Sequence, residues 1–146
     1  MSDAIWFQTP DVAALNELHR DTAVSQMGIE IVEVGDNYII GTMPVDRRTM
    51  QPFGLLHGGA AVLLLETLAS AAANHCVDAQ SAICVGVEVN CNHLRSVGAG
   101  RITGKAQAIH VGRSSMVWSL QAHDEQQRLV TVGRMTSAVV QLKPAT

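Results

Sequence analysis

The spacing of hydrophobic residues changes several times along the chain and outlines its secondary structure. Residues 58–77 contain no proline, are rich in alanine and leucine, and fit one helix of about 20 residues. After this helix, apolar residues recur at every second position, a pattern that indicates β-strands. These stretches cover residues 83–91, 102–108, 116–122 and 129–142. The pattern therefore predicts a long helix followed by strands.

The region before the long helix predicts a short helix and a hairpin. Residues 9–11 form a helix-start pattern, in which the Thr9 hydroxyl is expected to cap the helix, Pro10 to take its first position, and Asp11 to be favoured by the helix dipole. Apolar residues at helical spacing follow them. Apolar residues alternate over 27–34, turn residues follow at 35–37, and a second extended run covers 38–43. Residues 45–56 contain proline, glycine and charged residues and are expected to form a loop.

The long helix needs cover on every side, because it is apolar nearly all round and a surface helix would show a polar stripe. Strands of about nine to twelve residues match its length of roughly 30 Å. We expect an α+β fold in which a curved antiparallel sheet wraps this central helix. One sheet covers only one side of the helix, so a second copy of the chain is expected to cover the rest as a homo-oligomer. The 146 residues suit one domain, 1–146, with an N-terminal extension at 1–26.

Composition excludes several classes of protein. The net charge is −3 and aromatic residues make up 3%, so the basic surface and stacking side chains of a nucleic-acid binder are not expected. The longest apolar tract, residues 56–77, includes Glu66 and other polar residues that a membrane-spanning helix would carry only at high cost. The three cysteines lack CxxC spacing, and no basic segment precedes an apolar stretch at the N-terminus. We therefore expect reduced thiols and a cytoplasmic protein.

The histidines do not predict a metal site. Among the six histidines, His57, His75, His93 and His110 include no HxH, HxxxH or HExxH pair, and none of these four has a cysteine or acid at a familiar ligand interval. No P-loop, GxGxxG or GxSxG motif is present either. We expect no metal, no bound cofactor and no Ser-His-Asp hydrolase.

Glu66 is the most informative candidate, because a carboxylate within an apolar helix is costly unless something compensates its desolvation. Ser70 follows at i+4 on the same face and could orient the carboxylate by a hydrogen bond. Desolvation raises the pKa of a carboxyl group, and hydrogen bonds to its anion lower the pKa again. Together these effects can place the pKa where the group serves as a base. The alternative is a purely structural role, in which Glu66 reaches a helix end or a partner subunit.

The residues just before the helix predict a site that polarises a carbonyl group. Gly58 and Gly59 place their N–H groups in the first turn, where helices have unsatisfied donors and a positive dipole end. Gln51 and His57 could add side-chain donors. Such donors stabilise an oxygen that becomes an oxyanion. The alternative is that the glycines serve only a tight turn and close packing.

A basic segment lies within this acidic chain. No Asp or Glu occurs between Val89 and His123, and the segment contains Arg95, Arg101, Lys105 and Arg113. It is too small for a duplex but sufficient for a few phosphate groups. The segment therefore predicts an anionic ligand, unless these residues are only charged positions on exposed strand faces.

Four segments between about residues 28 and 140 form an ordered set of motifs: 51–70 (QPFGLLHGGAAVLLLETLAS), 43–49 (MPVDRRT), 85–96 (VGVEVNCNHLRS) and 110–115 (HVGRSS). This set resembles the hotdog-fold acyl-CoA thioesterases, in particular their aroyl-CoA branch. The resemblance implies a hotdog fold, active sites at dimer interfaces, and dimers that commonly pair into tetramers.

The resemblance also assigns roles to residues. It implies that Glu66 is general base or nucleophile, that Gln51, His57 and the Gly58 N–H hold the thioester carbonyl, and that Ser70 assists the attacking water. It implies further contacts to the CoA portion from Gly86, His93, Leu94, Arg95, Ser96, His110, Val111, Gly112, Arg113, Ser114 and Ser115. The substrate would be an acyl-CoA or acyl-carrier-protein thioester, so coenzyme A would enter as part of the substrate.

The expected activity is hydrolysis of a thioester to a free acid and a thiol. One alternative is a hotdog hydratase or dehydratase that acts on the acyl chain. Another is a non-catalytic acyl-CoA binder that uses the same basic groove. Release of free thiol distinguishes hydrolysis from both.

Overall fold

Residues 4–143 are described by the structure, a computed structural model of the chain. The first three residues, which bear on the expected lack of a targeting segment, lie outside this range. The described elements are α1 (Val12–Leu18), α2 (Ala23–Gln26), β1 (Glu30–Val34), β2 (Tyr38–Pro44), α3 (Gly58–His75), β3 (Ala82–His93), β4 (Arg101–Val111), β5 (Ser115–His123) and β6 (Leu129–Gln141).

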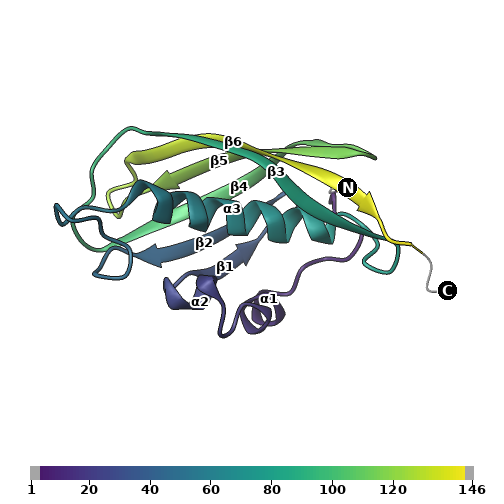
Figure 1. The fold of residues 1–146 in the computed structure, drawn as a ribbon, viewed down its shortest axis with the longest axis horizontal. Coiled ribbons are helices and arrows are strands. Elements are labelled where there is room, and N and C mark those ends of the chain that lie inside the picture. The colour runs from purple at the N-terminus through teal and green to yellow at the C-terminus, as the bar shows by residue number, and fades with distance from the viewer. Residues whose placement is uncertain (1–3, 144–146) are drawn as a thin grey trace.

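The strands form one antiparallel six-stranded sheet in the order β1-β2-β4-β5-β6-β3. The sheet curves over α3, which runs along its length (Figure 1). The expected α+β architecture, a long helix wrapped by a curved antiparallel sheet, is confirmed. Within residues 4–143, no helix is long and apolar enough to cross a membrane.

Close packing between α3 and the sheet depends on two facing glycines. Gly41 of β2 and Gly104 of β4 are register partners. A Cβ atom would lie 2.7 Å from Leu68 Cδ2 at position 41, and 2.9 Å from Leu64 Cδ2 at position 104. Because both leucines are fully buried, there is no free space into which they could move. The glycines therefore let the helix lie directly on the sheet.

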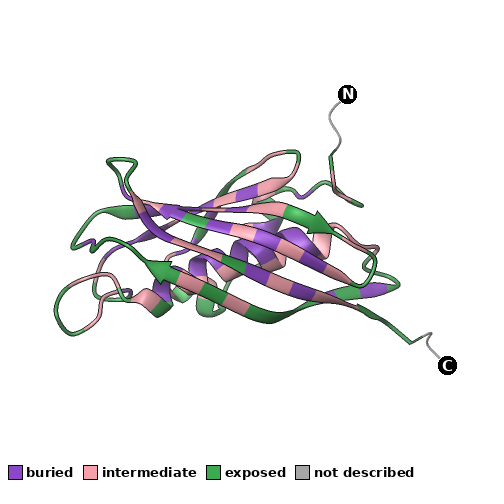
Figure 2. Cartoon of the chain, turned by 90° about the horizontal axis from the view of Figure 1, so that it is seen from above, coloured by how far each residue is buried: buried purple, intermediate pink, exposed green. Residues whose placement is uncertain are grey.

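The two edges of the sheet differ in how they are covered. At the β1 edge, the Asn16 side chain of α1 makes two hydrogen bonds to the Ile31 backbone. Its Oδ1 accepts from the Ile31 N–H (2.9 Å), and its Nδ2 donates to the Ile31 carbonyl (2.8 Å). At the β3 edge, Asn74 of α3 makes a similar pair of bonds only near the start of the strand, where it accepts from the Cys84 N–H (2.9 Å) and donates to the Cys84 carbonyl (3.0 Å). The apolar side chains of Ile83, Val85 and Val87 on this strand are 40%, 44% and 61% exposed. Figure 2 shows exposed positions along this edge of the sheet. A long exposed apolar edge strand invites pairing with another chain.

A β-bulge explains why the apolar positions of β3 do not all face the core. The register with β6 shifts between Gly86 and Glu88. Before the bulge, Ala82 and Cys84 are buried, while after it Val89 and Cys91 pack against the core. The extra residue changes which alternate positions face inward. The predicted strand is confirmed, but three of its seven apolar residues, Ile83, Val85 and Val87, are exposed.

The secondary-structure prediction is least accurate in the N-terminal region. Helix α1 is capped by Asp11, whose side chain accepts from the Ala14 N–H, so the prediction that the cap is at Thr9 is wrong. Helix α2 was not predicted. The first strand begins at Glu30 instead of position 27, because Met27 ends α2 and Gly28 has a φ of +68°.

Candidate active site

The first turn of α3 keeps one unused backbone donor. His57 caps the helix: its Nδ1 accepts from the Gly59 N–H (2.8 Å), and its carbonyl accepts from the Ala60 and Ala61 N–H groups (3.0 and 3.2 Å). The Gly58 N–H makes no hydrogen bond to any residue of the described chain. The expectation of two donors is therefore corrected to one, Gly58, because the cap occupies the Gly59 N–H.

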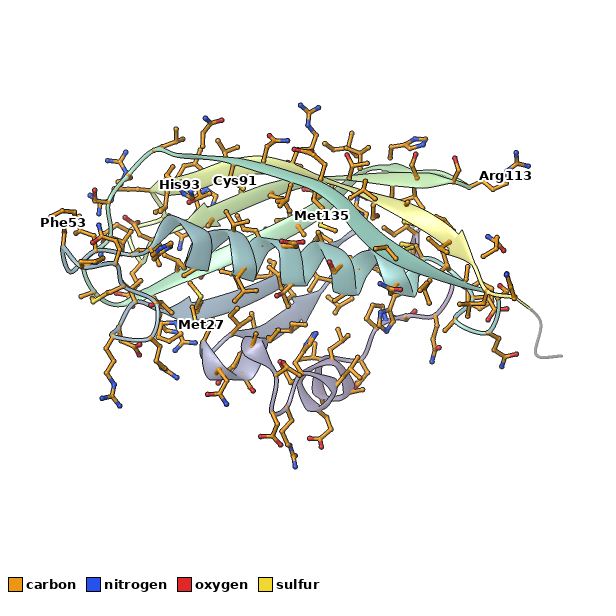
Figure 3. The ribbon with its side chains drawn as sticks, in the orientation of Figure 1. Met27, Phe53, Cys91, His93, Arg113 and Met135 are labelled. Atoms are coloured by element: carbon orange, nitrogen blue, oxygen red, sulfur yellow. The ribbon has the colours of Figure 1, made fainter. Side chains whose placement is uncertain are left out.

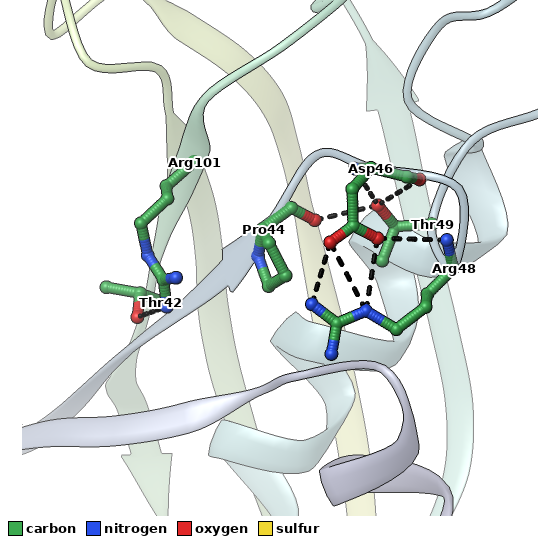
Figure 4. A network of polar contacts seen from close by, with 6 residues as sticks. All are labelled: Thr42, Pro44, Asp46, Arg48, Thr49 and Arg101. Atoms are coloured by element: carbon green, nitrogen blue, oxygen red, sulfur yellow. Dashed lines mark hydrogen bonds and ion pairs between the residues drawn. The ribbon is translucent and has the colours of Figure 1, made fainter.

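The loop before α3 is held by a compact polar network (Figure 4). The Thr49 hydroxyl donates to the Pro44 carbonyl (2.7 Å) and accepts from the Asp46 N–H (3.1 Å). The Arg48 guanidinium binds the Asp46 carboxylate and lowers its pKa to about 2. The His57 N–H in turn donates to the Thr49 carbonyl (2.8 Å). These bonds fix the start of α3 relative to the sheet.

Gln51 is oriented as a donor within this loop. Its Oε1 accepts from the Phe53 N–H, and this leaves the amide Nε2 free to donate to a ligand. Gln51 and Gly58 line one cavity of about 310 Å³, here called the donor cavity. The other residues lining the donor cavity are Leu55, Leu56, His93, Leu94, Arg95, Ser96, Val130 and Thr131. The sequence predicted most of the polar residues among them.

His93 lies directly against Gly58. Its Nδ1 is 3.1 Å from the Thr131 hydroxyl, and a Cβ atom at position 58 would lie only 2.7 Å from its Nε2. Glycine at this position thus keeps the space in front of the free N–H open. His57 instead lines a neighbouring cavity of about 270 Å³ with Met27 and Arg48, so it does not share the donor cavity. Because its Nδ1 accepts a hydrogen bond, a neutral His57 ring carries its proton on Nε2.

Glu66 lies in a separate cavity of about 340 Å³, here called the acid cavity. The cavity is lined by Leu15, Leu18, His19, Val24, Glu66, Thr67, Ser70, Ala71, Asn74 and His75. Two expectations about the carboxylate are wrong. Glu66 is partly exposed instead of fully desolvated, since α3 is open on this side, and the Ser70 hydroxyl contacts Met135 Sδ (4.0 Å) instead of the Glu66 carboxylate. Behind the carboxylate, a Cβ atom at Gly86 would lie 3.5 Å from Glu66 Oε1.

The basic segment does not form one patch within one chain. Arg95 lines the donor cavity, whereas Arg113 lies at the tip of the β4–β5 hairpin, at the opposite end of the molecule from His93 (Figure 3). Arg101 and Lys105 alternate with buried residues of β4, so they point away from α3. Arg101 donates to the Thr42 hydroxyl (2.8 Å), and Lys105 Nζ lies 4.1 Å from the centre of the Tyr38 ring. The prediction of a single cationic patch is therefore wrong for one chain.

The expected site residues fall into three separate groups. Gln51, Gly58 and His93 to Ser96 lie at the N-terminal end of α3; Glu66, Ser70 and Gly86 lie near its middle; and His110 to Ser115 form the distant hairpin tip. Glu66 follows Gly58 by eight positions, a rise of about 12 Å along the helix axis. The donor cavity and the acid cavity share no lining residue.

Sequence reasoning missed the N-terminal residues that line the acid cavity. Leu18 and Val24 were not predicted to be near Glu66, and neither was His19. They lie more than forty positions upstream of Glu66, so no local spacing pattern indicates the contact. The apolar face of α1 indicated only that this helix packs against another part of the protein, and it did not indicate which part.

Comparison with known proteins identifies the family. Residues 53–131 match the model of the thioesterase superfamily. A glutamine-to-alanine mutant of thioesterase PA1618 from Pseudomonas aeruginosa superimposes with a TM-score of 0.93 at 44% identity, covering 94% of this chain and 99% of that one. Thioesterase HI1161 from Haemophilus influenzae gives a TM-score of 0.92 at 42% identity, covering 97% and 99%.

This chain is also similar to a protein whose name states its substrate. The 1,4-dihydroxy-2-naphthoyl-CoA hydrolase of Escherichia coli is 40% identical over 136 residues, which cover 93% of this chain and 99% of that protein. The chain belongs to the thioesterase superfamily, has the hotdog fold, and is a thioester hydrolase. The comparisons favour hydrolysis over the hydratase and the non-catalytic binding alternatives.

Proposed function

We propose that the protein hydrolyses acyl-CoA or acyl-carrier-protein thioesters, with an aroyl group as the favoured acyl portion, in a site shared between two copies of the chain. The observation that carries this proposal is the division of the site. The free Gly58 N–H and the Glu66 carboxylate lie in separate cavities on one helix. A partner copy supplies the missing half of each site.

The open β3 edge supports this assembly. Two identical strands that pair antiparallel are related by a two-fold axis perpendicular to the strands. This axis also reverses the direction of α3, so the first turn of α3 in one copy lies alongside later turns of α3 in the other. Each donor cavity thereby approaches the acid cavity of the partner. The smallest assembly with complete sites is a dimer, and a tetramer made of two such dimers would keep the same sites.

The proposed chemistry uses the two halves differently. The thioester carbonyl oxygen accepts hydrogen bonds from the Gly58 N–H and from Gln51 Nε2, and the dipole of α3 favours the negative charge that develops there. Glu66 of the other copy either takes a proton from the attacking water or attacks the carbonyl carbon itself. In both cases the C–S bond breaks, the thiol leaves with a proton, and water supplies the second oxygen of the acid.

Ser70 and the basic residues have supporting roles in this proposal. Ser70 lies one turn after Glu66 and lines the same cavity, where it can orient the attacking water. Arg95 lies in the donor cavity, and the two-fold axis brings the partner's hairpin tip, with Arg113, toward that end. The basic residues that are separated in one chain would then bind the phosphate groups of one CoA molecule.

Release of free thiol from a panel of CoA esters tests the proposal. We expect the purified protein to release CoA and the free acid in equal amounts from benzoyl-CoA or 2-naphthoyl-CoA, and more slowly from medium-chain acyl-CoA esters. Thiol is followed with a chromogenic disulfide reagent and the acid by chromatography. Consumption of an enoyl-CoA without thiol release would show hydratase chemistry and would contradict the proposal.

A further inference from the structure

The acid cavity has two walls of different origin. One wall is the middle of α3, which carries Glu66. The other wall is the α1–α2 segment, which contributes Leu15, Leu18, His19 and Val24. The proposed site therefore includes residues from a part of the chain that the family model does not cover, since that match begins at residue 53.

The α1–α2 segment is a fixed wall and not a mobile lid. Before it, Trp6 Nε1 donates to the Gly35 carbonyl (2.9 Å) and the Phe7 N–H donates to the His75 carbonyl (2.9 Å). Within it, Asn16 makes its paired hydrogen bonds to Ile31. After it, the Ile29 N–H donates to the Val24 carbonyl (3.1 Å). These anchors join the segment to the sheet and to the C-terminal end of α3.

The polar side chains of α3 in this cavity are already engaged. The Thr67 hydroxyl donates to the Leu63 carbonyl (2.7 Å), and His75 Nδ1 lies 2.9 Å from the Ala71 carbonyl. Asn74 donates to the carbonyls of Ser70 and Cys84 (3.0 Å each). Apart from Glu66, the Ser70 hydroxyl and the unpartnered Nδ1 of His19, the lining therefore offers little hydrogen bonding to a ligand.

The remaining lining suits an uncharged apolar group. Leu15, Leu18, Val24 and Ala71 provide apolar surface. Burial lowers the pKa of His19, so its ring is neutral at neutral pH. A volume of about 340 Å³ lies within the range of roughly 300–1,000 Å³ that is usual for small-molecule sites.

We propose that the α1–α2 segment is the outer wall of the acyl pocket, and that Leu18, flanked by His19 and Val24, determines how large an acyl group fits beside Glu66. The inference rests on the proposed function, because it places the scissile thioester at Glu66 and the acyl group in the adjoining cavity. Leu18 is the adjustable part of this wall. It is 72% exposed, so changing its size alters the cavity without disturbing the core.

Two opposite substitutions of Leu18 test this role. The measurement is the ratio of kcat/KM for 2-naphthoyl-CoA to that for benzoyl-CoA, two substrates that share the CoA portion and differ in ring size. Leu18→Ala enlarges the cavity and should raise the ratio about tenfold, while Leu18→Trp should lower it by a similar factor. Val32→Ala on β1 is the matched control, because Val32 is 48% exposed and does not line the cavity. Its ratio should stay within about twofold of the wild type.

The outcomes separate this inference from the proposed function. Inhibition by free CoA should be the same in all variants, because the CoA portion lies outside the acid cavity. Ratios that do not change in either folded, active Leu18 variant would overturn the inference and leave the thioesterase proposal standing. A wild-type protein that hydrolyses neither ester would overturn both.

Discussion

Replacing Glu66 by glutamine is expected to lower kcat at least about 10²-fold, because the amide can neither accept a proton from water nor attack the thioester. The protein should remain folded. Glu66 is partly exposed and accepts no hydrogen bond from the described residues, so a neutral side chain of the same shape leaves the packing unchanged. Steady-state hydrolysis of benzoyl-CoA and thermal unfolding of the same sample check both expectations.

A matched control shows whether the loss belongs to this carboxylate. Glu125→Gln makes the same chemical change at an exposed position in the turn between β5 and β6, and it should leave kcat within about twofold of the wild type. If Glu66→Gln keeps wild-type turnover, the role assigned to the acid is wrong, whatever the panel of CoA esters shows.

The second large effect is expected from Gly58→Ala. A Cβ atom there would lie 2.7 Å from His93 Nε2, so the methyl group displaces His93 and narrows the approach to the free N–H. We expect kcat/KM to fall about 10²-fold, as when one oxyanion donor is lost. The melting temperature should stay the same or rise, because alanine favours the helix over glycine. Activity and stability should thus change in opposite directions.

Gly98→Ala provides the comparison for this variant. The nearest atom to a Cβ at position 98 is Leu55 Cδ2, at 3.8 Å, so the same substitution meets only an ordinary contact. Normal activity is expected there. An equal loss in both glycine variants would mean that the effect at Gly58 is not specific to the donor cavity.

The sequence predicted well those elements that are long enough for their apolar residues to form a regular pattern. An uninterrupted apolar run without proline defined α3 to within two residues of its end at His75, and alternation defined β3 to β6. Helix α2 was missed because it has only four residues, and its capping box pairs Thr22 with Ser25 instead of a glutamate or glutamine. Short elements of this kind depend on tertiary contacts more than on local preference.

The sequence singled out candidate site residues, but it did not predict how they are arranged in space. Glu66 was a candidate because a carboxylate within an apolar helix is costly unless something compensates its desolvation. Gly58 was a candidate because it is the first residue of that helix. Their placement in separate cavities could not be derived from spacing along the chain. The basic segment shows the same limit, because strands extend their residues over a long distance. Arg95 shares the donor cavity with His93, and His93 and Arg113 lie at opposite ends of the molecule (Figure 3).

Complementation between two inactive variants tests most directly whether each site is shared by two copies. Glu66→Gln and Gly58→Ala chains with different affinity tags are co-expressed, mixed dimers are isolated by sequential purification, and hydrolysis of benzoyl-CoA is measured. In a shared site, the mixed dimer has one site with both substitutions and one with neither, so it should regain about half of the wild-type activity. Mixed dimers as inactive as the two parent variants would place Glu66 and Gly58 in the same site of one chain and contradict the account.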